Sequence, residues 1–112
     1  MKQRIRNLKL AERGPGYWVN RTRYNSIALY CNDPKEAQLV YCALSRIMAD
    51  RKARRFNAGA SLITYSGLPL NRIEKALAEL EQIGAITQEL VSTPGGSQNV
   101  PFITIMGEVR YE

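Results

Sequence analysis

The chain has 112 residues and carries 16 Lys and Arg against 10 Asp and Glu, a formal net charge of +6. Its hydrophobic content of 45% and its length are those of one globular domain with a single modest core. The sequence contains no histidine, which excludes Ser–His and Cys–His nucleophile pairs and removes the commonest general base and metal ligand. We therefore expect a protein that is not an enzyme and that has no metal site and no cofactor.

The sequence also predicts no membrane span and no secretion signal. No apolar run approaches the roughly 18–20 residues that a membrane helix needs, and the charged start MKQRIRNLKLAERG lacks the apolar block of a signal peptide. Cys31 and Cys42 show no metal-ligand spacing and do not suggest a disulfide scaffold. We interpret them as reduced thiols and predict a cytoplasmic location without a membrane partner.

The positive charge is concentrated in the first half of the chain. Residues 1–56 hold 13 Lys and Arg against 4 Asp and Glu, whereas residues 57–112 hold 3 against 6. A basic surface makes an acidic polymer a natural partner. Residues 1–16 are predicted to be a basic N-terminal arm, either solvated or bound to nucleic acid or a partner, and residues 17–112 to be the folded domain.

Two segments ahead of the first long helix are predicted to be extended or connecting. The GPG triplet at 14–16 ends whatever structure precedes it. YWVNRTRY at 17–24 alternates and is rich in β-formers, which predicts an extended segment. SIALYC at 26–31 is apolar and favours a short strand or a connector packed on the core.

A long helix is predicted to begin at Pro34. Asp33 is a good N-cap, Pro34 suits the first helical position, and Glu36 completes a capping box. Apolar residues at helical spacing predict one buried face: Ala37, Val40, Tyr41, Leu44, Ile47 and Met48. The helix is expected to fade within RKARRFNAG, where Gly59 serves as the stop.

Two further helices are predicted around a glycine turn. Ser61 is expected to cap the short helix LITYS, and Gly67 to make the turn into GLPLNRIEKALAELEQIGAI at 67–86, an amphipathic helix. Its apolar stripe consists of Ile73, Ala76, Leu77, Leu80 and Ile83. The residues expected to face away from the stripe are Asn71, Arg72, Glu74, Lys75, Ala78 and Glu79.

The end of the chain predicts a hairpin. AITQELV at 85–91 and FITIM at 102–106 read as strands, and the turn-rich STPGGSQNVP at 92–101 joins them. The whole chain is therefore predicted to be mainly α with a small β-hairpin.

The stretch SLITYSGLPLNRIEKALAELEQIGAI resembles the central pattern of the winged helix-turn-helix family of DNA-binding domains. That pattern has a short helix with two core apolar residues, here Leu62 and Tyr65, and a Gly-Leu turn, here Gly67 and Leu68. A recognition helix ending in Leu-Glu-x-x-Gly-x-Ile follows, here LEQIGAI. The resemblance covers residues 34–106 and implies a winged helix-turn-helix with an N-terminal extension. SIALYCNDPKEAQLVYCAL resembles, less closely, a lead-in found in plasmid and phage replication proteins.

The resemblance implies a site for double-stranded DNA. In the family, the N-terminal part of the recognition helix enters the major groove; here that part comprises Leu70, Asn71, Arg72 and Lys75. The hairpin would be the wing, with a tip formed by Gly95, Gly96, Ser97, Gln98 and Asn99. Residues 92–101 contain no Lys or Arg, so phosphates must be neutralised elsewhere. The candidate contacts to the DNA phosphate backbone are Arg51, Lys52, Arg54, Arg55, Arg21 and Arg23. The alternative is that these residues are ordinary solvated surface residues.

Two functions of different classes are compatible with these features. The first is a small, non-enzymatic regulator that binds duplex DNA as a homodimer, in transcription or in plasmid- or phage-type replication or transfer. The alternative is a winged-helix protein-interaction module in a larger nucleic-acid-handling assembly, which the negative second half favours; RNA binding ranks third. Tyr17 and Trp18 are candidates either for the dimer contact or for the core.

Overall fold

The computed structural model of the chain describes residues 17–96 and 98–110. The elements in these residues are helices α2 (Arg21–Tyr30), α3 (Pro34–Arg51), α4 (Ser61–Ser66) and α5 (Leu70–Gln82), and strands β1 (Arg55–Phe56), β2 (Ile86–Ser92) and β3 (Asn99–Ile105). The strands form one antiparallel sheet in the order β1-β3-β2. The prediction of a mainly α chain with a small hairpin is confirmed, with β1 as an added third strand.

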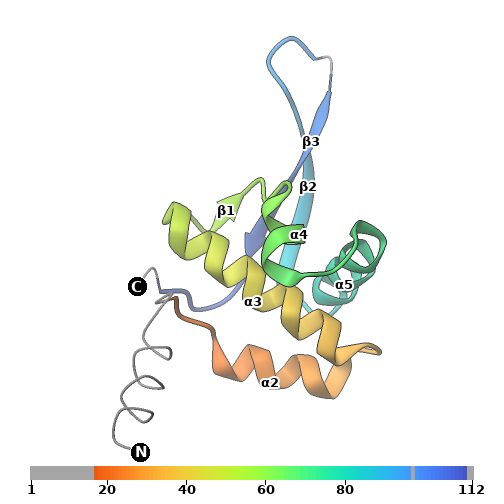
Figure 1. Cartoon of the computed structure of the whole chain (residues 1–112). Coiled ribbons are helices and arrows are strands. Elements are labelled where there is room, and N and C mark those ends of the chain that lie inside the picture. The colour runs from red at the N-terminus through yellow and green to blue at the C-terminus, as the bar shows by residue number, and fades with distance from the viewer. Residues whose placement is uncertain (1–16, 97, 111–112) are drawn as a thin grey trace, which may run out of the picture.

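Helix α3 is the element on which the other helices pack (Figure 1). Its six predicted core residues are all buried, and it also buries Ala43 and Ser45. The apolar stripe of α5 faces α3, with Ile73, Leu77 and Leu80 buried. Because α2, α4 and α5 share this one support, the core is a single cluster.

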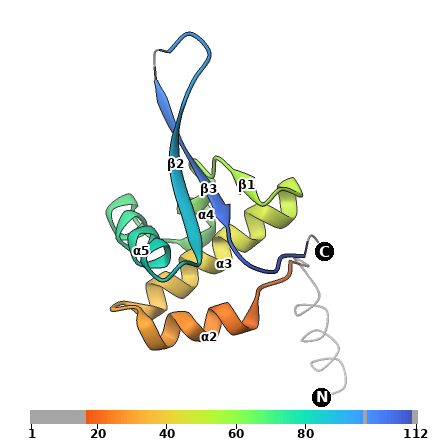
Figure 2. The same ribbon diagram turned by 180° about the vertical axis from the view of Figure 1, so that it is seen from behind.

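The helices cover one face of the sheet and leave the other face open (Figure 2). Ile86 pairs with Ile105 near the base of the hairpin, and both are buried, as is Ile103. Towards the tip, the two strands project past the helices (Figures 1 and 2), and Leu90 is 69% exposed there. Only the base of the hairpin therefore belongs to the core.

The predictions of an extended segment at 17–24 and of a strand or connector at 26–31 are wrong, because most of these residues form α2. Asn20 caps this helix, since its Oδ1 accepts a hydrogen bond from the Arg23 backbone N–H at 3.0 Å. Ile27 is fully buried against the rest of the core. The β-forming residue types of this segment are overridden by packing against α3.

Two predicted helix ends also need correction. Helix α3 ends at Arg51 because Lys52 adopts a left-handed conformation, with φ of 50°, and its N–H bonds to the Met48 carbonyl. The stop is therefore not Gly59, which lies beyond β1. Ser61 is the first residue of α4 and Ala60 takes the N-cap position.

The predicted capping box at the start of α3 does not form in the expected way. Asp33 makes no side-chain capping hydrogen bond. Instead, the carboxylates of Asp33 and Glu36 pair with Lys75 and Arg72 on α5. These two residues thus join α3 to α5.

Glu79 was expected to face away from the core, and this is wrong, because only 9% of the residue is exposed. Its Oε1 accepts a 2.6 Å hydrogen bond from the backbone N–H of Asn32, in the turn between α2 and α3. The turn between α2 and α3 therefore covers a side of α5 that the apolar stripe had predicted to be exposed to solvent.

Some predictions fall on residues that are not described. The basic arm at 1–16 and Ser97 of the wing both lie outside the described residues. Within the described part, no helix has the length and apolar character to span a bilayer.

Candidate nucleic-acid interface

The turn between α4 and α5 sets where the exposed face of α5 begins. Gly67 has a φ of 72°, a left-handed conformation that glycine adopts without strain. Its N–H bonds to the Ile63 carbonyl, which closes α4. The Leu68 N–H is satisfied by the Ser66 hydroxyl at 3.2 Å, and Pro69 then precedes the first turn of α5. Pro69 has no backbone N–H, and a backbone N–H at the start of a helix has no intrahelical carbonyl to bind, so proline fits this position.

The N-terminal part of α5 exposes the residues predicted to read DNA, but two of them are paired. Arg72 Nη1 lies 2.6 Å from Glu36 Oε2, and Lys75 Nζ lies 3.2 Å from Asp33 Oδ2. Together with Asn71, these four side chains line one shallow depression. Two cations and two carboxylates give this depression no net formal charge.

The ion pairs on α5 are weak enough to exchange. The side chains of Arg72 and Lys75 are 54% and 64% exposed, and those of Glu36 and Asp33 are 19% and 49% exposed; pairs open to solvent in this way are typically worth up to about 1 kcal/mol. A good bidentate Arg–guanine contact is worth about 1–3 kcal/mol of discrimination. A contact between Arg72 and a base can therefore replace its ion pair with Glu36. Because the depression has no net charge, its non-specific attraction for phosphate is small.

A second surface is the basic cluster of Arg51, Lys52, Arg54 and Arg55, all of which are exposed. Lys52 and Arg54 have no ion-pair partner among the described residues. Arg55 pairs with Glu89 at 2.6 Å and its guanidinium lies 4.5 Å from the centre of the Phe102 ring. Arg51 donates a hydrogen bond to the Asn57 carbonyl. Two of the four cations thus remain fully available for phosphate.

The basic cluster begins at Arg51, the last residue of α3, whereas Asp33 and Glu36 of the depression lie at the N-terminal end of this helix. At 1.5 Å per residue, Glu36 and Arg51 are about 22 Å apart along the helix axis. The structure therefore does not bring the predicted base-reading residues and the predicted phosphate contacts together. A separation of about 22 Å corresponds to about six base pairs along one strand, at 3.4 Å per nucleotide, so contact with both requires a duplex that runs along α3.

The two arginines of α2 differ in surroundings. Arg21 is exposed at the first helical position. Arg23 is half-buried, and its Nη1 donates to the Ile83 carbonyl at 3.4 Å, which ties α2 to the end of α5. Of this pair, Arg21 is the one placed to meet a phosphate.

Tyr17 and Trp18 pack against their own chain. Both are half-buried, and the Arg110 guanidinium lies 5.3 Å from the centre of the Trp18 ring. Burial raises the pKa of the Tyr17 hydroxyl, and Cys42 adds to this effect while Arg46 opposes it. These contacts favour the core role over the dimer contact.

The tip of the hairpin is built from its own hydrogen bonds. Gly95 and Gly96 take φ of 94° and 71°, which the turn requires. The Gln98 carbonyl accepts from both the N–H and the hydroxyl of Thr93, at 2.9 and 3.1 Å. Asn99 belongs to β3, and its side chain accepts from the Ser92 hydroxyl at 3.2 Å. The described tip residues present polar groups and no cation.

Metal-ligand groups and cysteines were the remaining candidates for a reactive site in the described part of the chain. No group of three or more Cys, Asp or Glu residues there is arranged to hold a metal ion. Cys31 and Cys42 are free, and burial raises the pKa of both thiols, so neither is an activated thiolate. Comparison of the chain with protein-family models, with curated proteins and with solved structures finds no match.

Proposed function

We propose that this chain is a non-enzymatic protein that binds double-stranded DNA and acts as a small regulator of transcription or of plasmid- or phage-type replication or transfer. The observation that carries the proposal is the exposed basic cluster, in which Lys52 and Arg54 have no ion-pair partner among the described residues. Unpaired cations gain most from phosphate, because contact releases counterions without breaking an existing pair.

The order of elements supports a winged helix-turn-helix as the scaffold. A long helix, a short helix, a glycine turn, an amphipathic helix and a hairpin follow one another from α3 to β3, as the family pattern requires. Helix α5 buries one face and exposes Asn71, Arg72 and Lys75 on another. Asn and Arg can pair bidentately with adenine and guanine. In this proposal, α5 supplies the sequence preference and the basic cluster supplies most of the affinity.

A homodimer forms part of the proposal, and the end of α2 is its candidate contact. Leu29 and Tyr30 are adjacent there and are 76% and 71% exposed. Exposed apolar side chains of this size gain by burial against a second copy. Sedimentation equilibrium of Leu29→Glu should show a monomer under conditions in which the unchanged protein is a dimer; a monomer in both samples, or a dimer in both, contradicts this contact.

DNA binding is tested by fluorescence anisotropy with a labelled random duplex at several salt concentrations. The double variant Lys52→Gln/Arg54→Gln should bind every duplex more weakly. Its slope of log affinity against log salt should also be shallower by up to about 1.8, at about 0.9 per phosphate contact. The charge-matched comparison is Lys52→Gln against Lys35→Gln, which changes an exposed cation outside the cluster that has no ion-pair partner among the described residues. Equal slopes for these two single variants would show that only net charge matters, and absence of duplex binding at low salt would refute the function.

A second candidate function is a protein-interaction module, and the pairing on α5 favours it. With Arg72 and Lys75 matched by Glu36 and Asp33, and with no Lys or Arg at 92–101, the α5 and hairpin surfaces carry no excess positive charge, and Glu74 and Glu81 make α5 slightly acidic. Polar surfaces without excess positive charge do not attract phosphate and are compatible with protein contacts. Competition between a duplex selected from random DNA and the random duplex separates the two functions, because the module predicts that Arg72→Ala leaves the preference between them unchanged.

A further inference from the structure

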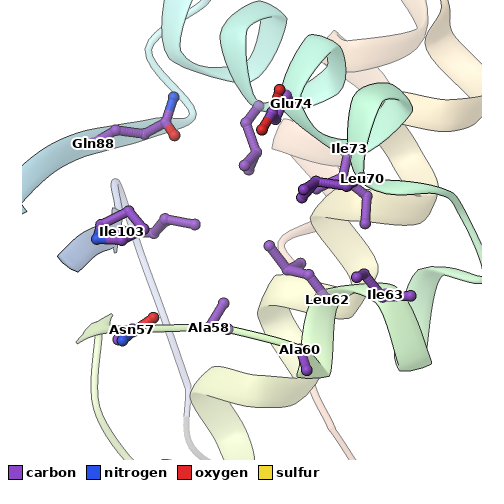
Figure 3. Close-up of a pocket in the computed structure, with 13 residues that line it drawn as sticks. Asn57, Ala58, Ala60, Leu62, Ile63, Leu70, Ile73, Glu74, Gln88 and Ile103 are labelled. Atoms are coloured by element: carbon purple, nitrogen blue, oxygen red, sulfur yellow. The ribbon is translucent and has the colours of Figure 1, made fainter. Parts of the chain in front are cut away.

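An apolar groove lies between α4, α5 and the hairpin (Figure 3). Its volume is about 450 Å³, and Leu62, Ile73, Leu77 and Ile103 form its apolar wall. Binding sites for small molecules commonly have volumes of about 300–1,000 Å³, with apolar walls and a few polar groups that converge on the ligand. The groove is therefore large enough for a small organic molecule.

Helix α5 presents one charged side chain to this groove. Leu70, Ile73, Glu74 and Leu77 all line it, and their spacing places them on one helix face. Glu74 occupies a position on this face where an apolar side chain would extend the wall. It forms no ion pair with a described residue, and no Lys or Arg lines the groove. The groove thus carries one uncompensated negative charge.

Gln88 of β2 adds a hydrogen-bond acceptor on the other side of the groove (Figure 3). Its Nε2 donates to Glu81 Oε1 at 3.3 Å, while its backbone N–H donates to Glu81 Oε2 at 3.2 Å. These bonds orient the amide and use one of the two Nε2 hydrogens, and its Oε1 can accept a hydrogen bond from a ligand. A carboxylate and an amide oxygen both require a donor, and an ammonium group offers three donors and a positive charge.

We propose that the groove binds a small amphipathic amine, with its apolar body against Leu62, Ile73 and Ile103 and its ammonium group at Glu74 and Gln88. Charge complementarity selects this class, because an anion would meet the Glu74 carboxylate with no compensating cation in the groove. The proposal is independent of DNA binding, since the groove and its polar groups are complete in the free chain.

The test uses phenethylamine as the probe, with phenethyl alcohol and phenylacetate as analogues of the same apolar body. Titrations of the full chain are followed by two-dimensional amide NMR and by calorimetry, without nucleic acid. Phenethylamine should shift the amide signals of α4, α5 and β2. It should also bind about two- to fivefold more tightly than the alcohol, the factor expected for one exposed charge contact. Phenylacetate should bind more weakly than either.

Two variants of equal charge decide whether Glu74 is the determinant. Glu74→Gln should remove the advantage of the amine over the alcohol while leaving the spectrum that of a folded protein, because Glu74 is exposed. Glu108→Gln makes the same chemical change at a residue that does not line the groove, and should keep the advantage. The proposal is overturned if phenethylamine causes no shifts around the groove, or if Glu74→Gln leaves the order of the three probes unchanged.

Discussion

The hydrogen bond from Asn32 to Glu79 predicts that two substitutions at one position differ in stability. Glu79 is 9% exposed, and its Oε1 accepts the Asn32 backbone N–H at 2.6 Å. Glu79→Ala removes the acceptor and leaves that N–H without its partner. Glu79→Gln keeps an acceptor oxygen in the same place and removes the charge.

The magnitudes separate the two variants. A hydrogen bond to a charged group contributes about 1.5–3 kcal/mol, so Glu79→Ala should lose about that much from a total of about 5–15 kcal/mol. This corresponds to a fall in melting temperature of roughly 6–24 °C for a domain of this size. Glu79→Gln should lose about 1 kcal/mol or less. It weakens the bond and leaves the amide Nε2 at the position of Oε2, which has no partner among the described residues, but it removes the larger cost of burying a charge there.

Urea unfolding followed by far-ultraviolet circular dichroism measures both changes, provided that the slope with denaturant is the same in all three proteins. Equal losses for Glu79→Ala and Glu79→Gln would show that the hydrogen bond does not hold the turn between α2 and α3 against α5. A gain of stability in Glu79→Ala would show that the cost of burying the charge exceeds the value of the bond.

Three further predictions concern the core, base reading and pH. Leu80 is fully buried, so Leu80→Ala should cost about 2–5 kcal/mol, whereas Gln82→Ala at an exposed position of α5 should cost less than about 0.5 kcal/mol; similar thermal melts would contradict the observed orientation of α5. Arg72→Ala should lower the preference for a duplex selected from random DNA by about 1–3 kcal/mol and leave non-specific affinity nearly intact; an unchanged preference in competition anisotropy rules out base reading by Arg72. Burial raises the pKa of Tyr41 to about 12, although the positive charge of Arg23 acts to lower it. The folded state therefore favours the neutral phenol, and this contribution is complete below pH 10 and is lost as the pH rises from about 10 to about 12. Unfolding free energies that stay constant through that window would contradict it.

The parts of the fold that sequence predicted correctly are those with strong local periodicity. The buried face of α3 and the stripe of α5 repeat at helical spacing, and the hairpin strands flank a turn-rich loop. Helix α2 lacks such a pattern, because Ile27 is its one fully buried residue. Strand β1 has two residues and exists through pairing with β3. Helix α2 therefore has no local signal strong enough to outweigh its β-forming residue types, and β1 is too short to have a local signal of its own.

The candidate site was less predictable because its side chains depend on distant partners. Asp33 and Glu36 match a capping box in the sequence, and only the approach of α5 shows that they pair with Lys75 and Arg72. Glu79 looks like a surface residue until the turn at Asn32, far away in the sequence, is placed over it. The sequence shows the basic cluster as an unusual run of cations. Its separation from the exposed face of α5 becomes visible only when α3 is seen to lie between them as one continuous helix.

The projection of the hairpin beyond the helices has a consequence for amide hydrogen exchange. Amides beside Ile86 and Ile105 lie over the core, so their protons should exchange only when the whole domain unfolds, whereas those near Gly95 should exchange through local opening of the strand ends. A segment that opens without unfolding the core also tolerates inserted residues. The turn at Gly95 and Gly96 is therefore a suitable place to attach a spectroscopic label, because the end of the hairpin projects away from α3 and the other helices (Figure 1).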